Sequence, residues 1–293
     1  MDAARRRLRV GVIGAGRVGP VLAAGLAAAG HQITAVSTGS QPQRVRDLLP
    51  DVPVRPALDV ARDLPDLLLL SVPDDGLAAL AAQLPARPGQ VVAHTSGAHG
   101  TCVLAPTTRQ GADPLALHPA MTFTGEPADL DRLPGIGYGV TAPAPVRPLA
   151  SQLVADLGGT PHWVAESARP LYHAALAHGA NHLVTLVNEA ADRLREAGVA
   201  DPAQLLAPLL RAALDNTLRL GDAALTGPVA RGDAGTLADH LRALASAAPG
   251  SVGVYRALAR RTADRAIAAG ALAPQTAEPL LAVLGAEPAW ESA

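Results

Sequence analysis

The stretch Val10-Gly11-Val12-Ile13-Gly14-Ala15-Gly16-Arg17-Val18-Gly19 decides the fold of this chain. Apolar residues lead into the spacing G-x-G-x-x-G, and an Ala/Leu-rich segment over residues 20–29 follows, so the sequence predicts a strand, a tight turn and a helix. In this context Gly14 permits the turn, Gly16 lets backbone approach a pyrophosphate, and Gly19 lets the helix pack on the strand. The helix N-terminus would present free N–H groups to the phosphates. We predict a dinucleotide site, against a merely structural turn, with contacts from Gly14, Ala15, Gly16, Arg17, Val18 and Gly19.

The end of the second predicted strand bears on the choice of dinucleotide. A site for NAD normally places an acidic residue near this point, but residues 36–46 contain none. Ser37, Thr38 and Arg44 could instead accept a 2′-phosphate, which predicts NADP(H) rather than NAD(H). The alternative is that these residues form only a turn and that Arg44 is solvated.

The rest of the N-terminal half alternates short apolar runs with helical spacing, a pattern typical of βαβ units and a mostly parallel sheet. After residue 166 the strand signals end and Ala/Leu-rich helices follow, interrupted near Gly198, Pro202, Gly227 and Pro249. We therefore predict an α/β Rossmann domain over residues 1–165, an all-α domain over 166–285 and a tail over 286–293. The predicted strands are 8–13, 33–36, 66–72 and 90–94, with edge strands near 137–141 and 162–164.

Composition excludes several classes of function. The formal net charge of -2 offers no basic surface for nucleic acid. No window has the roughly 18 consecutive apolar residues of a membrane span, and a single cysteine, Cys102, fits a reducing compartment, so we expect a cytoplasmic protein. The chain contains no lysine, which excludes a Schiff base or a catalytic ammonium.

Ligands of open α/β sheets bind beyond the carboxyl ends of the strands, so the loops at these ends are candidate contacts. Val72 and Pro73 could lie along the cofactor's ribose or nicotinamide, while Asp74 and Asp75 more simply cap the following helix. The segment 94–100 places His94, Ser96 and Gly97 near the expected hydride position, and a His-Pro turn places His118 nearby.

Residues 170–188 predict an uncharged helix with a polar strip that includes His173 and Asn181. Such a strip suggests shelter in an active site or a subunit interface. His178 and His182, four residues apart, could share a metal, but no third ligand completes a metal motif, and we predict none. Histidines buried in a core or an interface remain the alternative to catalytic ones.

These features together resemble a family of Rossmann-like oxidoreductases with a C-terminal domain of unknown function. The family is related to ketopantoate reductase, 3-hydroxyisobutyrate dehydrogenase and pyrroline-5-carboxylate reductase, and its second domain is similar to the C-terminal domain of 6-phosphogluconate dehydrogenase. The resemblance covers nearly the whole chain. It is carried by the glycine loop, the segments 71–74, 94–97 and 117–123, Tyr172 with His173 and Asn181, the segments 225–228 and 231–233, and His240.

The resemblance implies reduction of a small 2-oxo acid by NADPH, with 2-dehydropantoate of pantothenate biosynthesis as the leading substrate, and a homodimer formed through the helical domain. Ketopantoate reductase and the 3-hydroxyacid dehydrogenases use a lysine four residues before the asparagine, where this chain has Ala177. A histidine must therefore supply the proton, or the reaction differs. An imine reductase, a 3-hydroxyacid dehydrogenase and a non-catalytic NADP(H) sensor are the rival functions.

Imidazole can donate a proton near neutral pH, so His173 is the first candidate for the acid, followed by His118 and His94. Asn181 and Ser96 would orient the substrate or polarise its carbonyl, with His94 and Gly97 in contact with it. Arg231 would bind a substrate carboxylate through its planar fork, or else only pair with Asp233 in a turn between helices.

Overall fold

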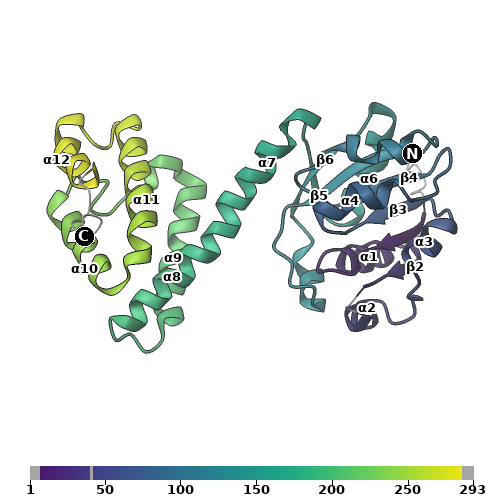
Figure 1. Cartoon of the computed structure of the whole chain (residues 1–293), viewed down its shortest axis with the longest axis horizontal. Helices are drawn as coiled ribbons and strands as arrows, with labels where there is room; N and C mark the ends of the chain where they lie inside the picture. Colours follow the sequence, from purple (N-terminus) through teal and green to yellow (C-terminus); the bar gives the residue numbers. More distant parts are fainter. Residues whose placement is uncertain (1–6, 40–41, 286–293) are drawn as a thin grey trace. The chain divides into compact units, whose positions relative to one another are not determined.

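The structure is a computed structural model that describes residues 7–39 and 42–285. The chain divides into two compact units, one ending at His182 and one beginning at Leu183. Figure 1 labels their helices and strands in chain order. The predicted tail 286–293 lies outside the described residues.

The N-terminal unit is built on one sheet of seven strands in the order β2-β1-β3-β4-β5-β6-β7. Strands β1 to β5 run parallel, β6 runs antiparallel to β5, and β7 runs parallel to β6. The carboxyl ends of β1 to β5 therefore meet at one edge, where the glycine loop also lies. The strands are β1 (Arg9–Ile13), β2 (Gln32–Ser37), β3 (Leu67–Leu70), β4 (Val91–His94), β5 (Asp113–Pro119), β6 (Gly137–Thr141) and β7 (Thr160–Trp163).

Helices cover both faces of this sheet, as the uninterrupted apolar run of β3 predicts. Leu67 and Leu69 pack on one face with α1 (Gly19–Ala28) and α6 (Arg147–Asp156). Leu68 and Leu70 pack on the other face with α3 (Ala57–Arg62) and α4 (Asp74–Ala81). Two short helices, α2 (Pro42–Leu48) and α5 (Ala105–Thr108), complete the unit. The predicted Rossmann-type architecture is confirmed.

Strand β5 is the element of the sheet that the sequence did not predict. The sequence predicts only a His-Pro turn at His118 and Pro119, and prolines are uncommon within a central strand. In the structure Leu115, Ala116 and Leu117 are buried between β4 and β6, and His118 pairs with Gly139 of β6. His118 is thus held on a strand, because its neighbours fill the sheet's core and the prolines stand only near the strand's ends.

The C-terminal unit is helical, and the described residues after Trp163 include no strand. Its core lies among α10, α11 and α12, around Leu237, Val252 and Leu280. The predicted helix interruptions are confirmed, since α8 ends before Gly198, α9 begins at Pro202 and α11 begins at Pro249. The helices are α8 (His182–Glu196), α9 (Pro202–Leu220), α10 (Ala234–Ala247), α11 (Pro249–Ala268) and α12 (Pro274–Gly285).

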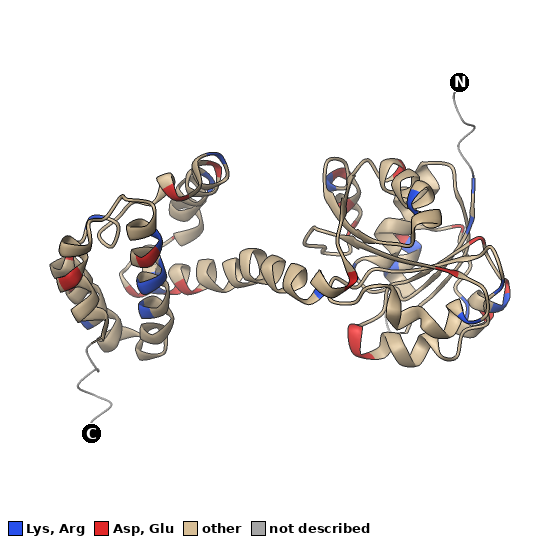
Figure 2. Ribbon diagram, turned by 90° about the horizontal axis from the view of Figure 1, so that it is seen from above, with Lys and Arg blue, Asp and Glu red and all other residues tan. Residues whose placement is uncertain are grey.

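The predicted helix over residues 170–188 is interrupted by a change in winding. It consists of α7 (Arg169–Leu176), one π-helical turn over Ala177–Asn181 and the start of α8. Figure 2 shows no charged residue along the ribbon over residues 170–188. In the described part of the chain, no helix is long and apolar enough to cross a membrane.

The compact N-terminal unit extends past the last strand because α7 is hydrogen-bonded to the sheet. Tyr172 bonds to His118 of β5, and Arg169 bonds to Gly139 of β6. The boundary that the sequence predicts at residues 165/166 follows the end of β7, where the type of secondary structure changes. It stays a prediction.

Candidate functional site

The glycine loop between β1 and α1 has the geometry that its spacing predicts. Gly14 has a φ of +107°, and a Cβ there would lie 2.1 Å from the Ser71 carbonyl oxygen. A Cβ at Gly19 would lie 2.2 Å from the Gly14 carbonyl oxygen, so the start of the helix packs directly on the loop. A Cβ at Gly16 would meet no atom within 4 Å, so backbone at this position is open to a ligand. The first and third glycines serve the protein's own packing, and the second leaves space.

The N-terminus of α1 provides unpaired donors at this open position. Val18 is the N-cap residue and offers no side-chain acceptor, and the first turn holds no acidic residue. The first N–H groups of a helix without a cap, together with the positive end of its dipole, favour an anion. Ala15 is buried under the loop, whereas Gly16 and Arg17 are exposed. The loop can therefore hold a pyrophosphate.

The residues after β2 lie beside a second segment that the sequence did not connect with them. Arg44 donates from Nε to the Gly125 carbonyl oxygen at 3.1 Å. The loop of Gly125 is held in turn by buried Asp129, which accepts from the N–H groups of Thr124 and Gly125 at 2.8 Å each. Within residues 7–39 and 42–285, the two terminal nitrogens of Arg44 make no hydrogen bond or ion pair, so the outer part of its fork can meet a phosphate.

Two further pairs of predicted contacts lie at the end of β2 and just after the end of β3. Ser37 is buried, and its carbonyl oxygen accepts from the Gly14 N–H at 3.1 Å, which ties β2 to the glycine loop. Thr38 follows it and is half-buried. Val72 is half-buried and Pro73 exposed, and Pro73 is the N-cap residue of α4. Asp74 and Asp75 occupy the first turn of α4, where carboxylates favour the helix dipole.

His94 lies inside the loop that follows β4. Its Nδ1 accepts from the Ser96 N–H at 3.2 Å, so the proton is on Nε2, which donates to the Gly100 carbonyl oxygen at 2.8 Å. Burial lowers the pKa of His94 to about 4, against the hydrogen bond to Gly100, which raises it. Ser96 is also used locally, because its Oγ accepts from the His99 N–H at 3.2 Å. These two side chains shape the loop from within.

A cluster of His118, Tyr172 and His173 lies where β5 meets α7. The Tyr172 hydroxyl is 2.9 Å from Nδ1 of His118, and the rings of His118 and His173 are 6.0 Å apart. Gly97 makes the approach of these rings possible, because a Cβ there would lie 2.6 Å from His173 and 3.0 Å from His118. The structure thus brings together Gly97, His118 and His173, which the sequence predicted in separate segments.

The surroundings of His118 favour its neutral form. Burial lowers its pKa to about 4, and the nearby His173 and Arg169 act in the same direction. Burial also raises the pKa of the Tyr172 hydroxyl, against the effect of Arg169. A neutral imidazole that accepts a hydrogen bond from the Tyr172 hydroxyl at Nδ1 carries its own proton on Nε2. His118 can then donate a hydrogen bond without being charged.

Arg169 anchors this cluster and was not predicted as a site residue. Its side chain is fully buried at the start of α7. It donates to the carbonyl oxygens of Ala116 and Gly139 at 3.3 and 3.1 Å and to Oγ1 of Thr141 at 2.8 Å. The guanidinium also lies 5.6 Å from the Tyr172 ring centre. Because it joins β5 and β6 to α7, Arg169 fixes Tyr172 and His173 against the sheet.

Glu166 joins a second pair of segments. Its carboxylate accepts from the N–H groups of Thr101 and Cys102 at 2.7 and 3.1 Å. Burial would raise the pKa of Glu166, but these hydrogen bonds outweigh it and lower the pKa. The loop that begins at His94 is therefore fixed to the segment between β7 and α7.

A cavity of about 360 Å³ opens beside the histidine cluster. His118 forms one wall from β5, and His173 and Asn181 approach from α7 and the π-helical turn. Turns of this kind recur at functional sites, because they shift the direction of the side chains that follow. The other lining residues are Ala120, Met121, Thr122, Leu176, Ala177 and Ala180.

Arg231 belongs to the C-terminal unit, where it is exposed in the turn before α10. Asp233 caps α10 by accepting from Thr236, from its N–H at 3.0 Å and from Oγ1 at 2.7 Å. Among the described residues, no group of three or more His, Cys, Asp or Glu could hold a metal ion. His178 and His182 are exposed and lie 3.1 Å apart between their Nδ1 atoms.

Two of the residues that shape the site carried only weak signals in the sequence. Tyr172 stands next to His173 in the segment that supports the family resemblance, but nothing there indicates its contact with His118. Arg169 precedes Pro170 at a helix start, a position typical of solvated side chains. Its burial depends on the carbonyl oxygens of two strands, which only the sheet's topology brings together.

Two family models match the chain. A Rossmann-like domain matches residues 1–119, and the Domain of unknown function (DUF2520) matches residues 136–262. The predicted combination of a Rossmann-like domain with a C-terminal domain of unknown function is therefore confirmed. No curated protein matches the chain.

Several solved structures share the fold. A Bacteroides fragilis protein assigned as an NADP oxidoreductase has a TM-score of 0.75 at 21% identity, over 88% of this chain and 98% of that one. The reductive aminase of Aspergillus terreus, solved with NADPH and ethyl levulinate, has a TM-score of 0.61 at 18% identity, over 94% and 99%. The 1-pyrroline-5-carboxylate reductase of Streptococcus pyogenes has a TM-score of 0.60 at 17% identity, over 89% and 99%.

Proposed function

We propose that this chain, a Rossmann-like domain followed by a DUF2520 domain, is an oxidoreductase that uses NADP(H). The observation that carries the proposal is the glycine loop, because Gly16 is open to a ligand at the N-terminus of a helix without a side-chain cap. Such an N-terminus is suited to a pyrophosphate. A structural turn alone would not require an open backbone position between two tightly packed glycines.

The end of β2 favours NADP(H) over NAD(H). No carboxylate stands between Val36 and Asp47 to bind a ribose hydroxyl, and Arg44 offers a fork whose outer nitrogens are not engaged by the described residues. An arginine fork matches the geometry of a phosphate. Of the proteins with this fold, the one from Bacteroides fragilis is described as an NADP oxidoreductase and the reductive aminase was solved with NADPH, which agrees with the proposal.

The cofactor, when bound, supplies a hydride, and the chain's own residues must handle the proton. We assign the proton donor to His173, which lines the cavity beside His118. His118, held neutral by burial and oriented by Tyr172, would donate a hydrogen bond to a carbonyl or imine nitrogen. Asn181 would orient the substrate from the π-helical turn, and Thr122 lies across the same cavity.

The substrate that we would test first is a small 2-oxo acid, with 2-dehydropantoate as its leading member. The second candidate is an imine, because the reductive aminase and the pyrroline-5-carboxylate reductase share the fold. Arg231 belongs to the C-terminal unit, so its contact with a substrate carboxylate stays a prediction of the sequence. His94 and Ser96 would support the site by shaping the loop around Gly97 rather than by touching the substrate.

The cofactor assignment can be tested by thermal unfolding with NADPH, with NADH or with neither. A ligand at a hundred times its dissociation constant stabilises the folded state by about 2.7 kcal/mol, so specific binding is visible. We expect stabilisation by NADPH and a smaller effect of NADH. Gly16→Ala should abolish the shift without lowering the stability of the free protein, because its Cβ meets no protein atom.

The matched control is Gly253→Ala on α11, which also adds a Cβ where no atom lies within 4 Å. It should leave the NADPH shift unchanged. An equal shift in wild type and in Gly16→Ala would show that the loop does not hold the cofactor.

The proton-transfer assignment requires turnover measurements on a confirmed substrate. His173→Ala and Asn181→Ala should each lower kcat, whereas His178→Ala, which changes an exposed histidine outside the cavity, should not. If both cavity variants keep near-normal turnover, the assignment is wrong. Tight NADPH binding with no turnover on any 2-oxo acid or imine would favour a non-catalytic NADP(H) sensor.

The protein would work as a cytoplasmic homodimer through its helical unit. The supporting observation is α9, where every residue from Arg211 to Leu220 is exposed although Leu214 and Leu218 are apolar. Leu214 and Leu218 are four residues apart and share one face of the helix, and an exposed apolar face of this kind favours a partner surface. A second copy of the chain supplies one by symmetry.

A further inference from the structure

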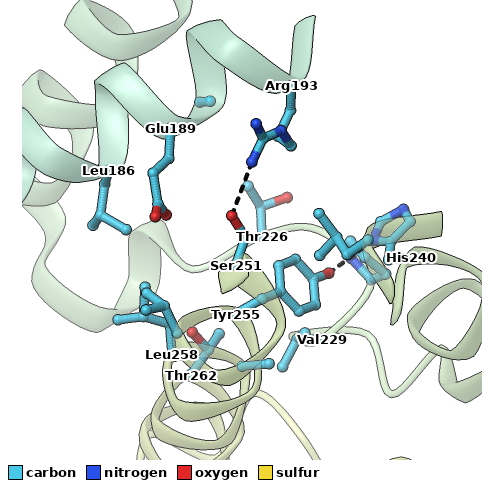
Figure 3. A pocket seen from close by; sticks show the side chains of 15 residues that line it. Leu186, Glu189, Arg193, Thr226, Val229, His240, Ser251, Tyr255, Leu258 and Thr262 are labelled. Carbon is cyan, nitrogen blue, oxygen red and sulfur yellow. Dashed lines mark hydrogen bonds between the residues drawn. The ribbon is translucent and has the colours of Figure 1, made fainter. Parts of the chain in front are cut away.

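The C-terminal unit contains a cavity of about 460 Å³ that belongs to none of the groups described above. It lies between α8, α10, α11 and the loop that precedes α10 (Figure 3). This volume is in the range of small-molecule sites. The lining residues are Leu186, Glu189, Ala190, Arg193, Thr226, Pro228, Val229, His240, Leu244, Ser251, Val254, Tyr255, Leu258, Ala259 and Thr262.

Most of this lining is apolar, and part of it is left open to solvent. Leu186, Val254 and Leu258 are aliphatic, and Val254 and Leu258 keep 44% and 39% of their surface exposed. Covering such side chains gains about 25 cal/mol for each Å² of apolar surface removed from water. A ligand for this cavity therefore needs an apolar body.

One charged group in the cavity has no partner. Figure 3 shows Glu189 on α8 with its carboxylate directed into the cavity, toward α11. Among the described residues, no hydrogen bond or ion pair reaches this carboxylate, although its helix carries Arg193 one turn later. Arg193, which also lines the cavity, pairs with Glu196 at 2.7 Å and donates to Oγ of Ser251 at 3.0 Å. The carboxylate of Glu189 is therefore left without an ion-pair partner among the described residues.

The aromatic side of the cavity also favours a cation. Burial raises the pKa of Tyr255, so its hydroxyl stays neutral, and that hydroxyl lies 2.7 Å from Nδ1 of His240. The hydroxyl is thus occupied, while the Tyr255 ring lines the cavity. An aromatic face attracts an ammonium group. Glu189 and Tyr255, on α8 and α11, point to the same ligand chemistry.

We propose that this cavity binds a small amphipathic amine. Its ammonium group pairs with Glu189, and its apolar body covers Leu186, Val254 and Leu258. Alkylamines are charged near neutral pH, as lysine side chains are. The site is complete within the C-terminal unit, so the inference is independent of the proposed cofactor and reaction.

The test is calorimetric titration of the full-length protein with cyclohexylamine, cyclohexanol and cyclohexanecarboxylate. These probes share an apolar ring and differ in the group that would meet Glu189. We expect the amine to bind at least about tenfold more tightly than the alcohol, a difference of about 1.4 kcal/mol. The carboxylate should bind more weakly than both, because it would approach the unpaired carboxylate of Glu189.

Glu189→Gln separates the charge from the shape of the cavity. It should weaken cyclohexylamine by about tenfold and leave cyclohexanol unchanged. Asp192→Asn is the matched control, because it also removes one carboxylate from α8 but changes a residue that pairs with Arg195 outside the cavity. Ala190→Leu fills the cavity and should weaken both ligands.

The apo unfolding temperature of each variant shows whether it is folded. No binding of cyclohexylamine to the wild type would overturn the proposal. Equal binding of the amine to wild type and Glu189→Gln would overturn it as well, since the affinity would then come from the apolar surface alone.

Discussion

The two units of this chain differ in how much of their apolar side-chain surface they bury. In the N-terminal unit, helices bury apolar side chains on both faces of the sheet, and buried groups such as Arg169 and Asp129 are hydrogen-bonded to loops and strands. In the C-terminal unit, α10 to α12 form a core, but α8 contributes no buried residue. The second half of α9 is exposed throughout.

This difference implies that the two units are stabilised in different ways, the first by internal polar contacts and the second by association. The N-terminal unit holds a rigid edge of loops, on which a site can be positioned without a partner. The C-terminal unit leaves apolar side chains exposed. Leu209, Leu214 and Leu218 are 63%, 51% and 79% exposed. Exposed apolar side chains on one helix are typical of an interaction surface. Polar contacts should therefore dominate mutational effects in the first unit, and association should dominate them in the second.

The largest expected effect in this comparison is that of Arg169→Met. The substitution leaves the carbonyl oxygens of Ala116 and Gly139 buried without their donor, which should cost about 4 kcal/mol in the free energy of unfolding. Arg195→Met, which removes an exposed ion pair with Asp192, should change it by less than about 0.5 kcal/mol. Denaturant unfolding measures both. Equal effects would mean that polar contacts do not set the stability of the N-terminal unit.

The second prediction concerns the dependence of stability on pH. Burial lowers the pKa of His94 from its ordinary value of 6.5 to about 4, so in this pH range the folded state binds fewer protons than the unfolded state. The stabilisation is complete above pH 6.5 and is lost as the pH falls toward 4, by roughly 3 kcal/mol.

Urea unfolding of wild type and His94→Gln across this range measures that contribution. The variant should lose less stability on acidification, whereas His162→Gln, at an exposed histidine, should follow the wild type. A wild-type slope in His94→Gln would assign the acid sensitivity to another group.

A smaller effect is expected for Tyr172→Phe, which removes the hydroxyl from Nδ1 of His118 and leaves the ring in place. Loss of one such hydrogen bond is worth about 1 kcal/mol, which corresponds to roughly a fivefold lower kcat. The affinity for NADPH should not change. If kcat and its dependence on pH both equal those of the wild type, Tyr172 does not orient His118 during turnover.

The smallest effect on folding, and a decisive one on assembly, is expected for Leu218→Asp. An exposed substitution should change the unfolding free energy of the monomer by less than about 0.5 kcal/mol. It should nevertheless shift the proposed dimer to monomer, as measured by sedimentation. Ala79→Asp on the exposed side of α4 is the control and should leave the dimer intact. A variant that remains dimeric would place the interface elsewhere.

The sequence by itself determined those turns, strands and helix starts that depend only on residues close together in the chain. The spacing of Gly14, Gly16 and Gly19 specifies a tight turn at a helix N-terminus, and the apolar run of β3 specifies a strand covered on both faces. Pro202 and Pro249 mark helix starts because proline cannot donate to the preceding turn. The order of the two domains followed from these signals.

Only the tertiary structure decided which distant groups meet. His118 was expected in a turn, but the pairing of β5 between β4 and β6 makes it part of a strand. Arg169 has no sequence signal for burial, because its acceptors are carbonyl oxygens of two strands and a threonine hydroxyl. Periodicity reports which face of an element is apolar, whereas backbone acceptors and the partners across a loop depend on chain topology, which no local pattern contains.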